Sequence, residues 1–120
     1  MSSRRMFQVN ELLRQEISRI VLTELNDPRF ERVTVTSVNT SADLHYARVF
    51  VQFHGDAAER DNALEALQHA QGRIRHILGK EVRIKYIPSL EFTYDDRLDY
   101  AERIYETLAE IKKKDAPPEA

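Results

Sequence analysis

Two neighbouring stretches of alternating side chains constrain the fold more than any other feature of the sequence. Residues 44–53 place an apolar side chain at every second position, with Val49 and Val51 on the same side of a predicted strand. Residues 32–39 are rich in β-branched side chains, which favour extended structure. Residues 40–43, which are typical of a turn, separate the two stretches. Because the connection is so short, the sequence predicts an antiparallel pair of strands.

On both sides of this pair, apolar residues recur every three or four positions, which is the spacing of helices that bury one side. Residues 7–25 form the first predicted helix, and the Asn-Asp-Pro sequence at 26–28 ends it. Residues 56–79 form the second, interrupted at Gly72, where we expect a bend or a close approach of another segment. Gly79 follows the stripe and suits the left-handed conformation that ends many helices.

The remaining residues predict a third strand and a last helix. Residues 82–94 alternate, with Tyr86 expected inward and Arg83 outward, and Pro88 should bend the strand or place it at an edge. Residues 97–113 carry a helical stripe of apolar side chains.

This order predicts an α+β domain over residues 1–111 and a disordered, charged tail over residues 112–120. We expect a three-stranded sheet with helices packed on one face. If the second and third strands are parallel, their connection should be right-handed. A chain of 120 residues has room for one such core.

The composition excludes several classes of site. The chain has no cysteine, which removes disulfides, cysteine-bound zinc, iron–sulfur clusters and thiol catalysis. The apolar stretches are too short to span a membrane, and the first residues do not resemble a secretory leader. We therefore expect a soluble, cytoplasmic domain that binds no cofactor or metal and takes no small-molecule substrate.

The net charge of -2 conceals an uneven distribution of charged residues along the chain. Residues 69–85 carry five cations against Glu81 alone, and residues 1–19 also carry a net positive charge. Residues 91–110 carry seven carboxylates against two arginines. Because salt screens each charge within about 8–10 Å, a basic zone can bind a polyanion on a slightly acidic chain.

The basic zone is the strongest candidate site, as a set of phosphate contacts on RNA. The alternative is an ordinary solvated surface. The candidate RNA-binding residues are Arg73, Arg75, Lys80, Arg83 and Lys85, with Arg4 and Arg5 as additions from the N-terminal residues before the first predicted helix.

Other candidate sites have simpler interpretations. His69 and His76 could share a helix face, but a metal would need a third ligand that the sequence does not provide. Asp95, Asp96 and Asp99 could hold a cation or exchange protons, yet carboxylates at this position are typical of a helix start. The sequence also lacks the common nucleophile and phosphate-loop motifs. We expect no enzymatic activity.

Five segments in the same order resemble the ribosome-binding factor A family over residues 4–108. They are Asn26–Arg29, Ser41–Val49, Ala70–Lys80, Val82–Phe92 and Tyr94–Asp95. The resemblance implies a KH-like fold of the second topological type. It also implies a non-enzymatic factor that binds the free small (30S) ribosomal subunit and its 16S rRNA. Such a factor assists late assembly and 5′-end processing of that RNA and supports growth in the cold.

One departure from ordinary KH domains bears on the mechanism. Their G-x-x-G loop clamps nucleotides, whereas here Arg75 stands three residues after Gly72. We expect Ala70 and Gly72 to shape a rigid helix bend that presents cations to structured RNA. Base stacking is not expected, because the sequence shows no row of exposed aromatic residues.

Two alternatives of other classes remain. One is a protein-interaction module acting through the acidic last helix, with Glu102, Glu106 and Glu110 as its contacts. The other is a small enzyme at the turn formed by Asp95 and Asp96. A monomer suits the RNA-binding role.

Overall fold

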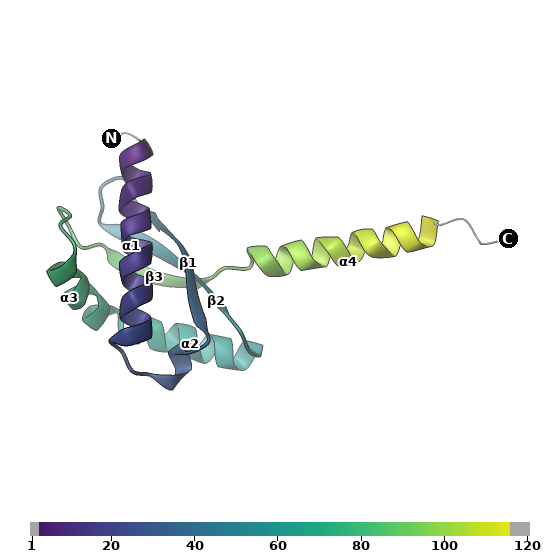
Figure 1. Cartoon of the computed structure of the whole chain (residues 1–120), viewed down its shortest axis with the longest axis horizontal. Coiled ribbons are helices and arrows are strands. Elements are labelled where there is room, and N and C mark those ends of the chain that lie inside the picture. Colours follow the sequence, from purple (N-terminus) through teal and green to yellow (C-terminus); the bar gives the residue numbers. More distant parts are fainter. Residues whose placement is uncertain (1–2, 116–120) are drawn as a thin grey trace.

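The computed structural model describes residues 3–115 and has the predicted order of elements. The elements are α1 (Ser3–Thr23), the short 3-10 helix η1 (Pro28–Phe30), β1 (Val33–Thr40), β2 (Tyr46–Phe53), α2 (Ala57–His69), α3 (Gln71–Glu81), β3 (Ser89–Tyr94) and α4 (Arg97–Asp115). The molecule measures 69 × 38 × 18 Å because α4 projects from the rest, which we call the body (Figure 1).

The body is built on a sheet of three strands in the order β1-β2-β3. β1 and β2 are antiparallel, whereas β2 and β3 are parallel. The register places Val49 beside Phe92, so both point to the same side of the sheet. Burial alternates along all three strands, because one face packs on helices and the other faces solvent. The α+β, KH-like architecture that the resemblance implied is confirmed.

The core lies between this sheet and the first three helices. The side chains of Leu13, Ile17 and Ile20 of α1 are fully buried against β1, as the stripe in the sequence predicted. Leu67 of α2 and Ile74 of α3 complete the same cluster. Burial of each large aliphatic side chain contributes about 1.5–3 kcal/mol to folding.

The helix bend lies at Ala70. This residue ends α2 and begins α3 with φ -82° and ψ 0°, a conformation that redirects the chain without a long loop. Gly72 lies inside α3, and a Cβ added there would meet open space, so the close approach expected at this glycine is absent. The prediction that Gly79 ends the helix is also wrong, because α3 continues to Glu81 and Gly79 keeps a negative φ.

The predicted third strand is only half formed. Residues 82–88 connect α3 to β3 without strand pairing, and β3 begins at Ser89. Two features explain the difference. Pro88 has no N–H to donate, and the paired length of β2 ends at Tyr46, opposite Ser89. Tyr86 is 42% exposed instead of inward. We call residues 82–88 the patch segment.

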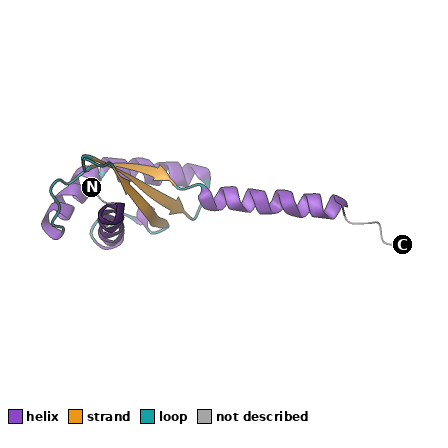
Figure 2. Ribbon diagram, turned by 90° about the horizontal axis from the view of Figure 1, so that it is seen from above, coloured by secondary structure: helices purple, strands orange, loops and turns teal. Residues whose placement is uncertain are grey.

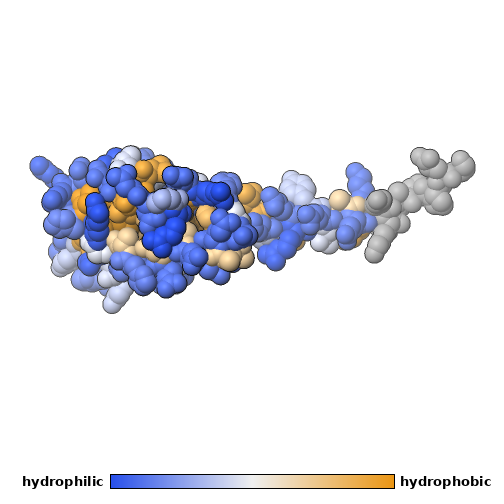
Figure 3. Space-filling model, turned by 90° about the horizontal axis from the view of Figure 1, so that it is seen from below, coloured by the Kyte–Doolittle hydropathy of each residue, from blue (hydrophilic) through white to orange (hydrophobic). Residues whose placement is uncertain are grey.

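The last helix also differs from the expectation, because α4 does not cover the sheet but extends away from the body (Figure 2). Its apolar side chains reach solvent at intervals among hydrophilic ones (Figure 3). They are Leu98, Tyr100, Ile104, Tyr105, Leu108 and Ile111. Residues 112–115 continue this helix instead of starting a tail, and residues 116–120 lie outside the described part of the chain.

Two glutamines occupy the outer edge of β3. Gln68 donates to the carbonyl oxygen of Leu90 at 2.9 Å and accepts from the N–H of Phe92 at 3.0 Å. Gln71 accepts from the N–H of Leu90 at 2.6 Å. These side chains bond backbone groups of β3 that would otherwise be free to pair with another strand. We call them the edge glutamines.

We expect Gln71→Ala to lower the free energy of unfolding by about 1–3 kcal/mol, because the buried N–H of Leu90 loses its acceptor. The measurement is urea denaturation followed by circular dichroism. Gln8→Ala, an exposed change on α1, is the matched control and should stay within about 0.5 kcal/mol. Equal effects of the two variants would contradict the role of the edge glutamines.

Candidate nucleic-acid interface

Three cations surround a pocket between the first half of α1 and the patch segment. The pocket has a volume of about 270 Å³, and Arg5, Arg83 and Lys85 line it. Its remaining lining residues are Gln8, Val9, Leu12, Leu44 and Ile84. Within residues 3–115, no carboxylate lines this pocket, so all the charged side chains in its lining are cations. We call Arg5, Arg83 and Lys85 the basic patch.

Arg75 fixes the patch segment in place. Its Nε donates to the carbonyl oxygen of Pro88 at 3.0 Å, and one of its terminal nitrogens donates to that of Ile87 at 3.0 Å. The guanidinium fork suits two neighbouring oxygens because it is planar and carries parallel donors. Val82 and Pro88 are buried at the two ends of the segment, which leaves Arg83 and Lys85 exposed between them. The guanidinium of Arg75 is therefore engaged by backbone carbonyl groups within the body.

The other cations predicted from the sequence are spread over the body. Arg73 donates to the carbonyl oxygen of Glu24 at 3.1 Å, at the end of α1 opposite Arg5. Lys80 is exposed in the last turn of α3, outside the pocket lining. Arg4 is exposed in the first turn of α1, beside Arg5 in sequence. The structure thus brings three of the seven predicted residues into one pocket.

An aromatic pair beside the basic patch was missed from the sequence. The rings of His45 and Tyr86 stack with centroids 4.7 Å apart and planes 28° from parallel. Lys85 places its Nζ 5.4 Å from the centre of the Tyr86 ring. His45 lies in the turn between β1 and β2. The alternation of side chains in residues 82–94 had predicted that Tyr86 points inward. The one signal in the sequence was the position of Tyr86 directly after Lys85.

The turn that carries His45 is held by short polar contacts. Asp43 accepts from the Ser41 hydroxyl at 2.6 Å and from the backbone N–H of His45 at 3.0 Å. These bonds, the Ser41 contact first, hold the pKa of Asp43 below its usual range. Leu44 adopts a left-handed φ of 65°, which is uncommon for a branched side chain, and buries that side chain. The turn therefore has one well-defined shape.

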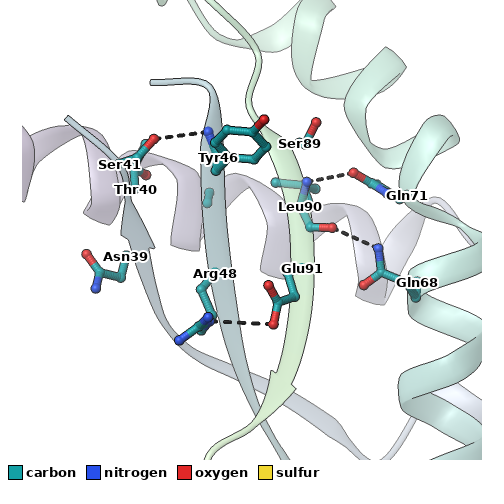
Figure 4. Close-up of a pocket in the computed structure, with 11 residues that line it drawn as sticks. Asn39, Thr40, Ser41, Tyr46, Arg48, Gln68, Gln71, Ser89, Leu90 and Glu91 are labelled. Atoms are coloured by element: carbon teal, nitrogen blue, oxygen red, sulfur yellow. Dashed lines mark hydrogen bonds and ion pairs between the residues drawn. The ribbon is translucent and has the colours of Figure 1, made fainter. Parts of the chain in front are cut away.

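A second pocket, of about 500 Å³, extends over all three strands, from β1 to the edge glutamines beside β3 (Figure 4). Arg48 and Glu91 form an ion pair at 3.6 Å on its wall. The edge glutamines already bond the N–H and the carbonyl oxygen of Leu90 there. A nucleotide base entering this pocket would find these backbone groups occupied. The basic patch is therefore the stronger candidate for nucleic-acid contact.

The carboxylates near the start of α4 have a structural role. Asp95 is buried, accepts from Thr36 at 2.7 Å and from Arg97 at 2.6 Å, and bonds the backbone N–H of Arg97. The Arg97 contacts are the main cause of a pKa for Asp95 well below its usual range. A carboxylate that stays ionised is a poor proton donor near neutral pH. The geometry thus joins α4 to the sheet and gives Asp95 a structural role at this turn.

Tyr94 adds a second link at the same junction. Its hydroxyl donates to Asp99, which raises the pKa of Tyr94, and Arg60 lies 4.5 Å from the centre of its ring.

Among residues 3–115, the structure contains no helix with the length and apolar character that a membrane-spanning segment needs. In the same range, no three potential ligands are grouped to hold a metal ion.

Comparison with known proteins identifies the family. The sequence model described as "Ribosome-binding factor A" matches residues 5–108. The protein of that name from Halothermothrix orenii is 42% identical over 96% of this chain and 94% of its own length. The chain belongs to the ribosome-binding factor A family.

Solved structures of the ribosome-binding factor A family agree with the fold. The crystal structure of the Thermus thermophilus protein aligns with a TM-score of 0.68 at 28% identity, covering 74% of this chain and 94% of that one. A Thermus thermophilus homology model fitted into a cryo-electron microscopy map of a 30S complex aligns with a TM-score of 0.60 at 29% identity. It covers 72% of this chain and 90% of that one.

We expect Arg75→Ala to lower the free energy of unfolding by about 1–3 kcal/mol, because two carbonyl groups lose a charged donor. Arg83→Ala, which removes the same charge from an exposed position, should change it by less than about 0.5 kcal/mol. Guanidinium denaturation measures both. If Arg83→Ala proves the more destabilising variant, the two arginines have been assigned the wrong roles.

The lowered pKa of Asp95 predicts an acid-sensitive contribution to stability. Because the folded-state pKa lies below the unfolded value of about 3.9, the contribution is complete at pH values well above 4 and is lost as the pH falls below it. Asp95→Asn should cost about 1–2 kcal/mol near neutral pH, and the difference from the wild type should shrink by about pH 3. Urea denaturation across this range measures it. A difference that does not change with pH would contradict the ion pair.

Proposed function

We propose that this protein is a ribosome maturation factor that binds the free small (30S) subunit through its 16S rRNA, with the basic patch as the contact surface. The observation that carries the proposal is the convergence of Arg5, Arg83 and Lys85 on one pocket whose lining, within the described residues, includes no carboxylate. A relative fitted into a map of a 30S complex supports the choice of partner. The protein acts as a monomer in the cytoplasm.

The geometry supports binding through shape and phosphates. A rigid segment held by Arg75 presents two exposed cations beside α1, and phosphate contacts of this kind fix position and orientation on RNA. Each neutralised phosphate releases counterions, so the affinity should fall with salt. Such a contact can hold an RNA conformation during late assembly and 5′-end processing without any chemical step. The family's support of growth in the cold fits a factor that stabilises RNA structure.

The projecting helix α4 favours a second contact, with a protein. Its apolar side chains are exposed, and Glu102, Glu106 and Glu110 are exposed among them. Carboxylates repel phosphates, so α4 suits a basic protein surface with apolar side chains better than it suits RNA. A photo-crosslinker at Leu108 should give a product with a protein of the bound small subunit, whose size does not change on ribonuclease treatment. A product whose size falls on ribonuclease treatment would contradict this contact.

The principal test is co-sedimentation of purified variants with salt-washed small subunits. The double variant Arg83→Gln/Lys85→Gln should bind at least about tenfold more weakly. The slope of log affinity against log salt should fall by about 0.7–0.9 for each phosphate that the variant no longer neutralises. Both side chains are exposed, so the circular dichroism spectrum should not change.

The matched control is Arg29→Gln/Arg32→Gln, which removes the same charge near the other end of the sheet. Val33 pairs with Phe53 there, whereas the patch segment enters the sheet opposite Tyr46. The control should bind like the wild type. An equally weakened affinity in the two double variants would mean that net charge, and not the basic patch, determines binding.

A further inference from the structure

The aromatic pair has no role in the core of the body. His45 and Tyr86 are both exposed, and they come from segments 41 residues apart in the sequence that meet at one end of the sheet. Two exposed rings that stack on each other present an apolar, planar surface to solvent. Such a surface is the kind on which a nucleotide base stacks.

Both rings are held on well-fixed backbone. The N–H of His45 donates to Asp43, and its carbonyl oxygen accepts from the N–H of Ser89 at 2.9 Å. Tyr86 lies just before the two carbonyl groups that Arg75 binds. The rings therefore need little further ordering when a ligand arrives, which favours binding.

The basic patch adjoins the pair. Lys85 lines the patch pocket and also lies over the Tyr86 ring, so one side chain connects the two surfaces. A cation–π contact at an exposed site is weak, and a phosphate competes with it readily. A base stacked on the pair would thus have cations close to its own phosphates.

We propose that the stacked rings of His45 and Tyr86, beside the basic patch, bind an unpaired base, so that the protein recognises RNA where a nucleotide leaves the helix. This inference rests on the proposed function and adds the class of RNA structure recognised. A continuous duplex hides its base faces in the stack, whereas a bulged nucleotide exposes them. The pair therefore distinguishes RNA by shape and not by sequence.

The test uses an RNA hairpin with an unpaired bulge and the same hairpin without it, each titrated with the full chain. The wild type should bind the bulged hairpin at least about fivefold more tightly, the lower end of what stacking on one aromatic side chain contributes. His45→Ala/Tyr86→Ala should lose this preference and still bind the paired hairpin. Tyr86→Phe should keep it, because the ring remains.

Tyr105→Ala is the matched control, since Tyr105 is an exposed tyrosine on α4 and lies outside the pair. It should keep the wild-type preference. Equal affinity of the wild type for both hairpins, or an unchanged preference in the double alanine variant, would overturn the stacking site while leaving RNA binding intact. If the wild type binds neither hairpin and Arg83→Gln/Lys85→Gln binds small subunits normally, the proposed function fails as well.

Discussion

The guanidinium group of Arg75 is the contact on which the proposed interface depends. It binds the carbonyl oxygens of Ile87 and Pro88, the last two residues before β3. Residues 82–88 have no strand partner, because β2 pairs with β3 only from Ser89 onward. These bonds to α3, together with the packing of Val82 and Ile87 on the core, hold the segment in place. The bonds bring Arg83 and Lys85 beside α1 and Tyr86 onto His45. An internal cation thus positions the external ones.

Polar side chains also set the limits of the body. The edge glutamines close the outer side of β3, where an open strand could pair with another chain. At the other end of β3, Asp95 joins α4 to the sheet through Thr36 and Arg97. Apolar packing forms the core, whereas polar contacts decide which edges and helices stay available to partners. The apolar side of α4 and the basic patch are consequently separate surfaces.

The sequence predicted the elements of the body better than their edges or the site. The stripe of α1 and the alternation of β2 each report a local period, and both are confirmed. The patch segment was mistaken for a strand because alternation cannot show that the partner strand has ended. The sequence did not reveal that Arg75 binds backbone carbonyl groups, because these partners lie 12 and 13 residues away. The aromatic pair was missed because His45 lies in a turn and Tyr86 in a loop, and neither has a regular spacing that shows which side chains meet.

The absence of cysteine permits a direct test of where the RNA lies. A single cysteine at Ser89, beside the patch segment, can carry a tethered iron chelate that cleaves nearby RNA, with Ala58 at the start of α2 as the distant position. In complexes with small subunits, the account expects strong cleavage of 16S rRNA from position 89 and weak cleavage from position 58. Stronger cleavage from position 58 would contradict the assignment of the basic patch as the RNA-binding surface.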